Sequence, residues 1–476
     1  MNKFSKIYPE RSRGTKIIFI AILFFGVFGL TKSSWAAGSL TIPAIPSLAD
    51  ERATYASWGL TWDASAEPNK TSATPVTISN PDIHGDTEGD DLWTNLHMYR
   101  RTGQRGYLER AKGWARYFKD DYLQCVPGGT SNSYTLCDPN IEDAGWNEII
   151  HKPWDHLFGW GLIDYYLYSG DSSYLTAAIN IGEQLKIRYD LEPTGNGIPP
   201  FMGGTTPSQA MAWDGARMRA RHLLFMTRLA EVTGDAKWAT LRDKMINMWL
   251  YASDYDSRGM YFAGIDLTNY YSAGLYESGV RVQSAFQMGI IMETFYQAYR
   301  TTGNAALKQR IIDVANFIKT YALDPTYQQV HSYWGLKNGT LWGVYTQQGS
   351  RTPSTNPPEN GCGAPGDIWW DPVYSTSMVN SMMIGYKLTG DVSYYNMAKT
   401  MFLRGANAKG YGSALCRNSA EAQGKISHFA DSQFDTGNEI YFAKNKGELQ
   451  YTYMLFEQSG SSDTIPPAAP TGLSVN

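Results

Sequence analysis

The stretch WNEIIHKPWDHLFGWGLIDYYLYSGD, residues 146–171, contains the unit from which most of the chain is built. It begins with a segment rich in aromatic and ionisable residues, continues as a helix that is apolar on nearly every side, and ends in the turn Ser169-Gly170-Asp171. An amphipathic helix is then expected to begin near Tyr174. A helix that is apolar all round is buried, whereas an amphipathic helix has an exposed face. The unit therefore predicts a hairpin of one inner and one outer helix.

The turn of this hairpin recurs along the chain. The equivalent turns are Thr102-Gly103-Gln104, Ser169-Gly170-Asp171, Thr233-Gly234-Asp235, Thr302-Gly303-Asn304 and Thr389-Gly390-Asp391, with glycines 67, 64, 69 and 87 residues apart. Glycine suits the left-handed residue that ends a helix, and the Asp or Asn after it suits the start of the next helix. Five hairpins are predicted in this way.

The helices on the two sides of each turn differ in hydrophobicity. The helices before the turns are apolar almost all round, as in Leu157–Tyr168, His222–Val232, Met288–Tyr299 and Val379–Leu388. The helix after the fourth turn has apolar residues three and four apart, with Lys308, Arg310 and Asp313 between them. We predict an inner layer of buried helices within an outer layer of half-exposed ones. Leu48–Trp58 and Lys446–Gln458 are expected to form a composite sixth hairpin that closes the ring.

The first 36 residues have the pattern of a cleaved secretory signal. Basic residues precede 14 apolar residues, Ile17–Leu30, and Ser34-Trp35-Ala36 follows with small residues where a signal peptidase needs them. A membrane anchor is the alternative, but a membrane-spanning helix needs about 20 apolar residues. We therefore expect a secreted or periplasmic protein with no stable anchor after cleavage.

Charge and cysteine content agree with export and argue against nucleic acid as a partner. Residues 1–36 hold six basic residues and one acidic residue, so the net charge of the remaining chain is −4 − 5 = −9. No basic patch is expected on such a chain. Cys125 and Cys137 are predicted to form a local disulfide, and Cys362 and Cys416 a second one, with four free thiols as the alternative.

The C-terminal residues 459–476 differ from the rest of the chain. Ser459-Gly460-Ser461-Ser462 has the composition of a flexible linker, and the Pro-Pro-x-x-Pro-x-x-Leu-x-Val pattern after it resembles the first strand of a bacterial fibronectin type III module. The expected organisation is a signal peptide in residues 1–36, a helical domain in residues 37–458, and a linker with the truncated start of such a module in residues 459–476.

The repeated inner-then-outer hairpins with Thr-Gly-Asp turns, after a secretion signal, resemble the six-hairpin glycosidase superfamily. The resemblance covers residues 45–458 by pattern and identifies no single family. It implies an all-α fold, an (α/α)6 toroid whose sixth hairpin is incomplete or composite. Many polysaccharide lyases share this toroid. In the superfamily the substrate, an oligo- or polysaccharide, lies in the cavity at the end that carries the long loops.

The segments just before the inner helices hold the candidate site residues, because loops that precede parallel helices open at one end. Three of these segments contain a Trp-Asp pair, with the Asp 15 to 20 residues before the turn glycine. An indole face can cover the apolar face of a pyranose while the carboxylate meets a hydroxyl or the glycosidic oxygen. Taken singly, each pair also suits a helix start, with Trp at the core rim and Asp as the cap.

Paired carboxylates are the chemistry expected at this site. Glycoside hydrolysis uses one protonated carboxyl as the acid and a second carboxylate as base or nucleophile. Asp155 and Asp214 are the preferred catalytic pair, and Asp86 and Glu88 come next. The residues expected to bind substrate are Trp154, His156, His151, Trp213, Arg217, Glu277, Arg281, Trp370, Asp371 and Tyr374. Whether the outcome is retaining or inverting depends on the carboxyl separation, which the sequence does not contain.

Two other functions remain open at the level of sequence. A polysaccharide lyase would use a His or Tyr base and Arg side chains to neutralise a uronate carboxylate. Of Arg217, Arg219 and Arg221, at most two are expected to reach the cavity, since residues two apart on a helix point to different sides. A non-catalytic glycan-binding or scaffolding protein is the other alternative. No cofactor and no metal are predicted, because the acidic run near Asp86 lacks the spacing of a calcium loop.

Overall fold

A computed structural model describes residues 56–57, 61–62, 74–77, 92–93, 95–96, 99, 103–122, 159–190, 215–251, 255–264, 281–323, 331, 333–347, 353–354, 368–369, 372–407 and 425–426. All of them belong to one structural unit, Ala36–Asn476. Within these ranges no helix is both long and apolar enough to cross a membrane. The predicted signal peptide, the four cysteines, Lys446–Gln458 and residues 459–476 lie outside the described residues, as does most of Leu48–Trp58.

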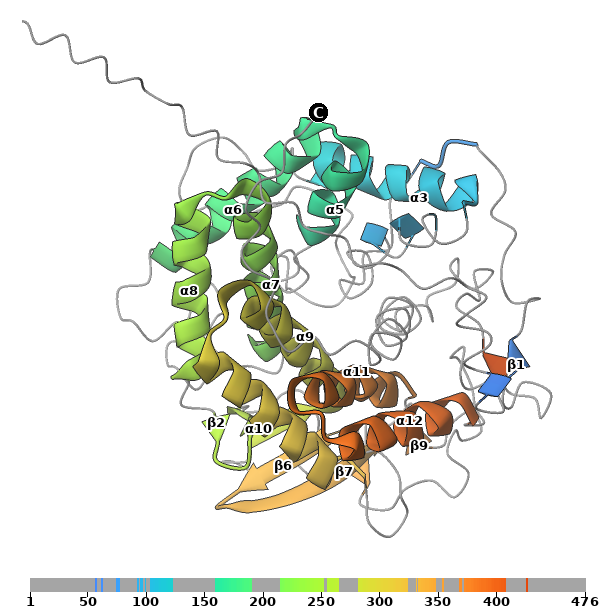
Figure 1. Ribbon diagram of the computed structural model, residues 1–476, viewed down its shortest axis with the longest axis vertical. Coiled ribbons are helices and arrows are strands. Elements are labelled where there is room, and N and C mark those ends of the chain that lie inside the picture. Colours follow the sequence, from blue (N-terminus) through green and yellow to red (C-terminus); the bar gives the residue numbers. More distant parts are fainter. Residues whose placement is uncertain are drawn as a thin grey trace, which may run out of the picture. The chain divides into compact units, whose positions relative to one another are not determined.

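The described helices form successive hairpins of an inner and an outer helix (Figure 1). The hairpins are α5 (Gly159–Ser169) with α6 (Ser172–Asp190), α7 (Gly215–Thr233) with α8 (Ala236–Leu250), α9 (Ala285–Thr302) with α10 (Ala305–Tyr321), and α11 (Pro372–Thr389) with α12 (Val392–Asn407). Ahead of them, α3 (Arg105–Arg116) continues as one wide turn of π-helix, η2 (Tyr117–Tyr122). Each of these α-helices begins or ends next to one of the predicted turns.

All five turns have the same backbone structure. Gly103, Gly170, Gly234, Gly303 and Gly390 have positive φ angles between 63° and 73°. Each glycine N–H donates to the carbonyl oxygen four residues earlier, at distances from 2.7 to 3.0 Å. In four of the turns the next residue caps the following helix. The carboxylates of Asp171, Asp235 and Asp391 accept from the backbone N–H two residues on, at 2.9 Å, and the amide oxygen of Asn304 accepts from the Leu307 N–H at 3.0 Å. Gln104, after the first glycine, makes no such side-chain cap. Local sequence alone therefore specifies where each hairpin reverses.

The inner helices pack side by side in chain order, α5 on α7, α7 on α9 and α9 on α11, and each also packs on its own outer helix (Figure 1). Their side chains are buried on several faces, as with Leu223, Phe225 and Met226 in α7. In the outer helix α10, Leu307, Ile311 and Ile318 are buried, with exposed residues between them. The predicted all-α class, with inner and outer helices as in an (α/α) toroid, is confirmed.

A β-sheet that the sequence analysis did not predict lies among the connections between hairpins. Its strands are β4 (Ala263–Gly264), β5 (Arg281–Ser284), β6 (Tyr333–Lys337), β7 (Thr340–Gln347), β8 (Pro353–Ser354) and β9 (Ile368–Trp369). The order is β4-β5-β6-β7-β8, and β9 pairs with β7. Strands β6 and β7 are joined by Asn338-Gly339, both with positive φ, the dipeptide preferred in two-residue hairpin turns. The Asn-Gly signal for this hairpin is present in the sequence.

Smaller strand pairs complete the described structure. β2 (Tyr255–Asp256) and β3 (Met260–Tyr261) form an antiparallel hairpin after α8, and β1 (Thr61–Trp62) pairs in parallel with β10 (Lys425–Ile426). The tyrosine hydroxyl of Tyr255 donates to Asp313 in α10 at 3.0 Å. This contact attaches the β2–β3 hairpin to the outer layer.

Candidate functional site

The starts of the inner helices carry the segments in which the sequence places the site. Helix α7 begins at Gly215 and α11 at Pro372, each one residue after a predicted Trp-Asp pair, and α5 begins at Gly159, four residues after Asp155. The backbone N–H groups of a helix start are unpaired and favour negative charge. The Trp-Asp pairs thus precede three described inner helices, α7 and α11 directly and α5 by four residues.

Helices α5 and α7 run in the same direction. A Cβ added to Gly159 would lie 2.2 Å from the ring of Phe225, so the start of α5 packs closely on the middle of α7. Further along both helices, the carboxylate of Asp164 pairs with the guanidinium of Arg228. Because the contacts advance together along the two helices, their N-termini point to the same end.

The sheet connects the starts of α9 and α11. Strand β5 leads without a break into α9 at Ala285, and β9 ends at Trp369, three residues before α11 begins. Both strands belong to one hydrogen-bonded sheet through β6 and β7. Arg281 and Trp369, the residue before the Trp370-Asp371 pair in the sequence, therefore belong to the same sheet.

One face of this sheet packs on the helices. Gln283 and Trp334, which are cross-strand neighbours, are 2% and 1% exposed. The Gln283 amide donates to the Tyr261 carbonyl at 2.7 Å, and the Trp334 indole N–H donates to the Tyr321 carbonyl at 3.0 Å. Arg281 is two residues before Gln283, hence on the same face, and is partly buried. Of the predicted site residues, Arg281 is the one whose side chain the structure describes.

The other predicted site residues are only partly covered by the structure. Arg217 lies in the first turn of α7 and Tyr374 in the first turn of α11, and only their backbone is described. The remaining predicted residues lie outside the described residues: Asp86, Glu88, His151, Trp154, Asp155, His156, Trp213, Asp214, Glu277, Trp370 and Asp371. Their roles stay predictions. Within the described ranges no group of three His, Cys, Asp or Glu residues is arranged to hold a metal ion.

Arg219 of α7 packs against the outer layer of helices. The guanidinium of Arg219 lies over the Trp249 ring of α8, 4.9 Å from its centroid, and Arg219 is 6% exposed. One turn on, His222 is fully buried and its Nδ1 is 3.0 Å from the Tyr189 hydroxyl of α6. Arg219 and His222 thus hold α7 to the outer layer, which makes Arg219 a structural residue.

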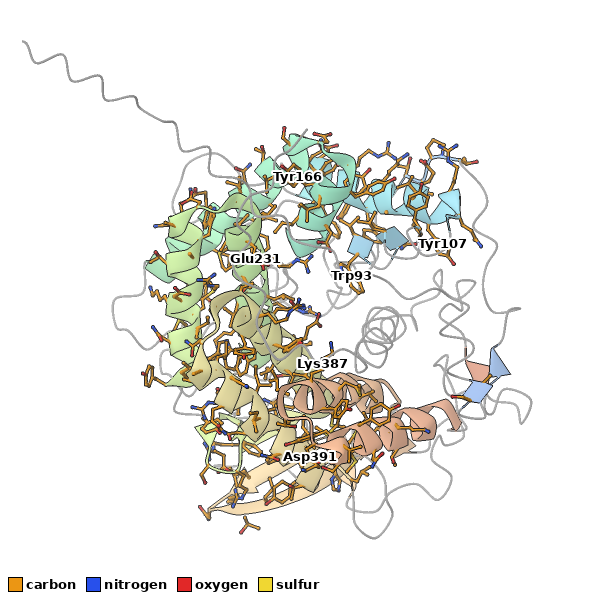
Figure 2. All side chains as sticks on the ribbon, in the orientation of Figure 1. Trp93, Tyr107, Tyr166, Glu231, Lys387 and Asp391 are labelled. Carbon is orange, nitrogen blue, oxygen red and sulfur yellow. The ribbon has the colours of Figure 1, made fainter. Side chains whose placement is uncertain are left out.

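A group of charged residues near the turn ends of α5 and α7 was not predicted from the sequence; Asp164 is buried, and Arg228 and Glu231 are partly exposed. Asp164, 1% exposed, pairs with Arg228 across α5 and α7, and Glu231 follows one turn later on α7 (Figure 2). Burial raises the pKa of Glu231 to about 7 against the opposing effect of Arg228 and Arg300. The available signal was a charged residue six residues before two turn glycines, inside helices that are otherwise apolar.

Glu231 is distant from the start of α7. Glu231 is 16 residues after Gly215, which corresponds to about 24 Å along α7. A carboxyl with a pKa near neutrality is a common feature of catalytic sites, but structural charge clusters shift pKa values as well. Because of its position near the turns, we assign Glu231 to the packing of the inner layer and not to the predicted site.

Comparisons with known proteins identify no sequence relatives and several similar folds. No family model and no curated protein matches the sequence. Among solved structures, the cellobiose 2-epimerase from Spirochaeta thermophila DSM 6192 is 12% identical, with a TM-score of 0.49 over 86% of this chain and 97% of that one. The cellobiose 2-epimerase from Bacillus thermoamylovorans B4167 is 12% identical, with a TM-score of 0.44 over 74% and 85%.

A third similar structure is a glycosyl hydrolase of family 88 from Bacteroides vulgatus, 12% identical, with a TM-score of 0.44 over 79% of this chain and 94% of that one. All three are carbohydrate-processing enzymes by name. Identity and structural similarity at this level are too low to transfer a reaction or a residue role from any of them.

Proposed function

We propose that the protein is a carbohydrate-active enzyme, a glycoside hydrolase in which Asp155 and Asp214 act as the acid and its partner carboxylate. The observation that carries the proposal is the position of the Trp-Asp pairs, which come directly before α7 and α11 and four residues before α5. Such pairs combine a flat apolar face for a sugar ring with a carboxylate for its polar edge. Asp86 and Glu88 are the next candidates if this pair is not the catalytic one.

The described helices set a geometric condition on the pair. Phe225, beside which α5 begins, is 10 residues after Gly215, so the start of α7 extends about 15 Å beyond the start of α5. The four residues from Asp155 to Gly159 span at most about 13 Å when extended. Even fully extended along the direction of α5, this segment ends a few ångströms short of the level of Asp214, a gap that the two side chains must close. The two carboxyls must then lie within about 10 Å of each other for either hydrolytic mechanism.

The first prediction concerns these two carboxylates. Asp155→Asn and Asp214→Asn should each lower the rate of reducing-end release from a susceptible oligosaccharide by about 10²-fold or more, because the amide neither donates nor accepts the proton. Asp243→Asn is the matched control, since Asp243 lies exposed on the outer helix α8 and pairs with its neighbour Arg242. Circular dichroism and the thermal midpoint should be unchanged in all three variants.

Other outcomes distinguish the alternative functions. Products that absorb as unsaturated uronates would identify a lyase, and conversion between epimers of a disaccharide without new reducing ends would identify an epimerase. Glycan binding without turnover in the wild-type protein would identify a binding protein. Full activity in both Asn variants would exclude the pair and direct the search to Asp86 and Glu88.

Export is part of the proposal, since a polysaccharide is met outside the cell. The basic and apolar leader in residues 1–36 supports it. Protein recovered from the medium or periplasm of an expressing bacterium should begin near Ala37, as measured by N-terminal sequencing. Recovery of the intact leader in the membrane fraction would contradict cleavage.

A further inference from the structure

The outer helix α3 is basic in a chain that is acidic as a whole. Residues 99–122, which contain α3 and η2, hold seven Lys and Arg and three Asp and Glu, a net charge of 7 − 3 = +4. Without residues 1–36 the chain has a net charge of −9, so the rest of it carries −9 − 4 = −13. This segment differs from the expectation, drawn from net charge, that the chain has no basic patch. A local excess of cations on an acidic protein directs anions to one part of its surface.

Three cations of this segment form a row along one face of α3, here called the basic row. Arg105, Lys112 and Arg116 are seven and four residues apart, a spacing that places them on the same side of a helix. Arg105 and Arg116 are exposed, and the side chain of Lys112 is 36% exposed. Ala111 and Trp114 are buried on another side of the helix. The row extends about 16 Å along the helix axis.

The carboxylates of the protein neutralise the basic row only in part. Glu109 is 7% exposed and pairs with the Lys112 ammonium at 2.8 Å. Arg116 donates to the carbonyl oxygens of Lys112 at 3.3 Å and Val76 at 3.0 Å, which leaves further guanidinium N–H donors. Among the described residues no ion pair includes Arg105 or Arg116. The two arginines can therefore each bind an anionic group from solution.

A series of tyrosines in contact with one another lies along α3. The ammonium of Lys119, in η2 at the end of α3, is 5.3 Å from the centre of the Tyr174 ring. The ring centres are 4.6 Å apart for Tyr174 and Tyr165, 6.1 Å for Tyr165 and Tyr168, and 5.9 Å for Tyr168 and Tyr99. Tyr99 belongs to the turn that leads into α3. The series thus reaches from the end of α3 to its beginning, and Tyr168, 37% exposed, provides an accessible ring there.

We propose that the exposed face of α3 is a second binding surface for an anionic polysaccharide, separate from the candidate site: Arg105 and Arg116 bind its carboxylate or sulfate groups, and Tyr168 packs on a sugar ring. A guanidinium can donate two parallel hydrogen bonds to such an anion, and a tyrosine ring can cover the apolar face of a pyranose. The outer helix runs from the turn toward the end at which the inner helices begin. A polymer bound along the basic row would therefore extend toward that end and raise the local concentration of substrate.

The choice of a glycan among polyanions rests on the proposed function and on charge spacing. Duplex nucleic acid carries one charge per about 1.7 Å of its axis, so the acidic rest of the chain would repel it along its whole length. An acidic polysaccharide has at most a few charges per sugar. Two arginines about 16 Å apart suit such a polymer better.

Affinity electrophoresis of the full chain tests the proposal, with polygalacturonate or dextran sulfate in the gel and mannan as the neutral glycan. The double variant Arg105→Gln/Arg116→Gln should bind the anionic glycan roughly tenfold more weakly at low salt and with a smaller salt dependence. The control Lys237→Gln/Lys308→Gln removes the same charge from α8 and α10 and should bind like the wild-type protein. Equal binding by the two double variants, or tighter binding of duplex DNA than of either anionic glycan, would overturn the proposal.

The role of the exposed tyrosine has its own matched pair of variants. Tyr168→Ser should weaken binding of the anionic glycan several-fold, because the ring that packs on the sugar is lost. Tyr251→Ser is the control, since Tyr251 follows α8 and is 83% exposed. Equal binding by these two variants would exclude Tyr168 from the surface.

Binding is measured without turnover, so this proposal and the proposed function can fail separately. Hydrolysis with equal binding by the two double variants would remove only the surface on α3. Binding through Arg105 and Arg116 without hydrolysis would remove only the glycoside hydrolase. If Arg105→Gln/Arg116→Gln fails to fold, amide hydrogen exchange of the wild-type protein decides: polygalacturonate or dextran sulfate should slow exchange in α3 roughly twofold or more, with α12 unchanged. No slowing in α3 with either glycan would refute the idea.

Discussion

The Asp164–Arg228 pair is a residue-scale feature with large expected consequences. Asp164 is 1% exposed, and the Nε of Arg228 is buried without a hydrogen-bond partner. Such pairs add little net stability compared with apolar residues of similar size, but loss of one partner leaves a buried charge unpaired. The pair therefore contributes mainly by specifying how α5 lies on α7.

Substitution of Asp164 by Asn should destabilise the protein by about 3–5 kcal/mol, since the guanidinium of Arg228 would remain buried without its carboxylate. Urea unfolding measures this change. The double variant Asp164→Leu/Arg228→Met should recover most of the loss. For comparison, Glu183→Gln removes the exposed Lys237–Glu183 pair and should cost less than about 1 kcal/mol. Equal losses for the buried and the exposed pair would contradict this account.

At the scale of a single element, the β6–β7 hairpin contains two glycines that are required for different reasons. Gly339 has a φ of +81°, with no atom within 4 Å of an added Cβ. Gly343 has an ordinary strand backbone, but its Cβ would lie 2.2 Å from the ring of His331. One glycine therefore serves the backbone conformation of the turn, and the other makes room for a side chain.

These reasons predict different responses to alanine. Gly339→Ala should cost about 1 kcal/mol from the left-handed backbone alone. Gly343→Ala should cost about 1–3 kcal/mol from overpacking against His331. The substitution His331→Ala should then offset much of the Gly343→Ala loss and none of the Gly339→Ala loss, as a double-mutant cycle of unfolding free energies would show. If His331→Ala rescued both variants, or neither, the two glycines would not be required for these different reasons.

On the scale of the whole molecule, the helical repeat could be predicted because its information is local. The glycine turns and the change from all-round apolar to amphipathic helices locate the four described hairpins, and the predicted apolar stretches end within three residues of the observed inner helices. Helices α7 and α11 begin seven residues before the predicted stretches. Burial of Leu162, Phe225 and Met292 follows from the same pattern. Short-range chemistry, repeated at each turn, is sufficient to specify this part of the fold.

The sheet and the charged residues near the turns could not be predicted from local sequence patterns. Strand β5 pairs with β6 across about 50 residues of sequence, and no local pattern in Arg281–Ser284 indicates that partner. Asp164 and Glu231 stand within apolar helices, where a charged residue can equally mark an exposed edge. The positions of the predicted catalytic side chains relative to one another depend on long connecting segments. Local sequence patterns do not specify how such segments fold.

The five turns share the positive φ of their glycine and make one end of the hairpins short and polar, with Asp171, Asp235 and Asp391 exposed there. A cysteine introduced at one of these exposed positions would let the protein be coupled to a bead or electrode in a known orientation. The connecting segments at the opposite ends of the helices would then face the solution. Immobilised preparations of this kind would allow continuous flow of a polymer over the protein.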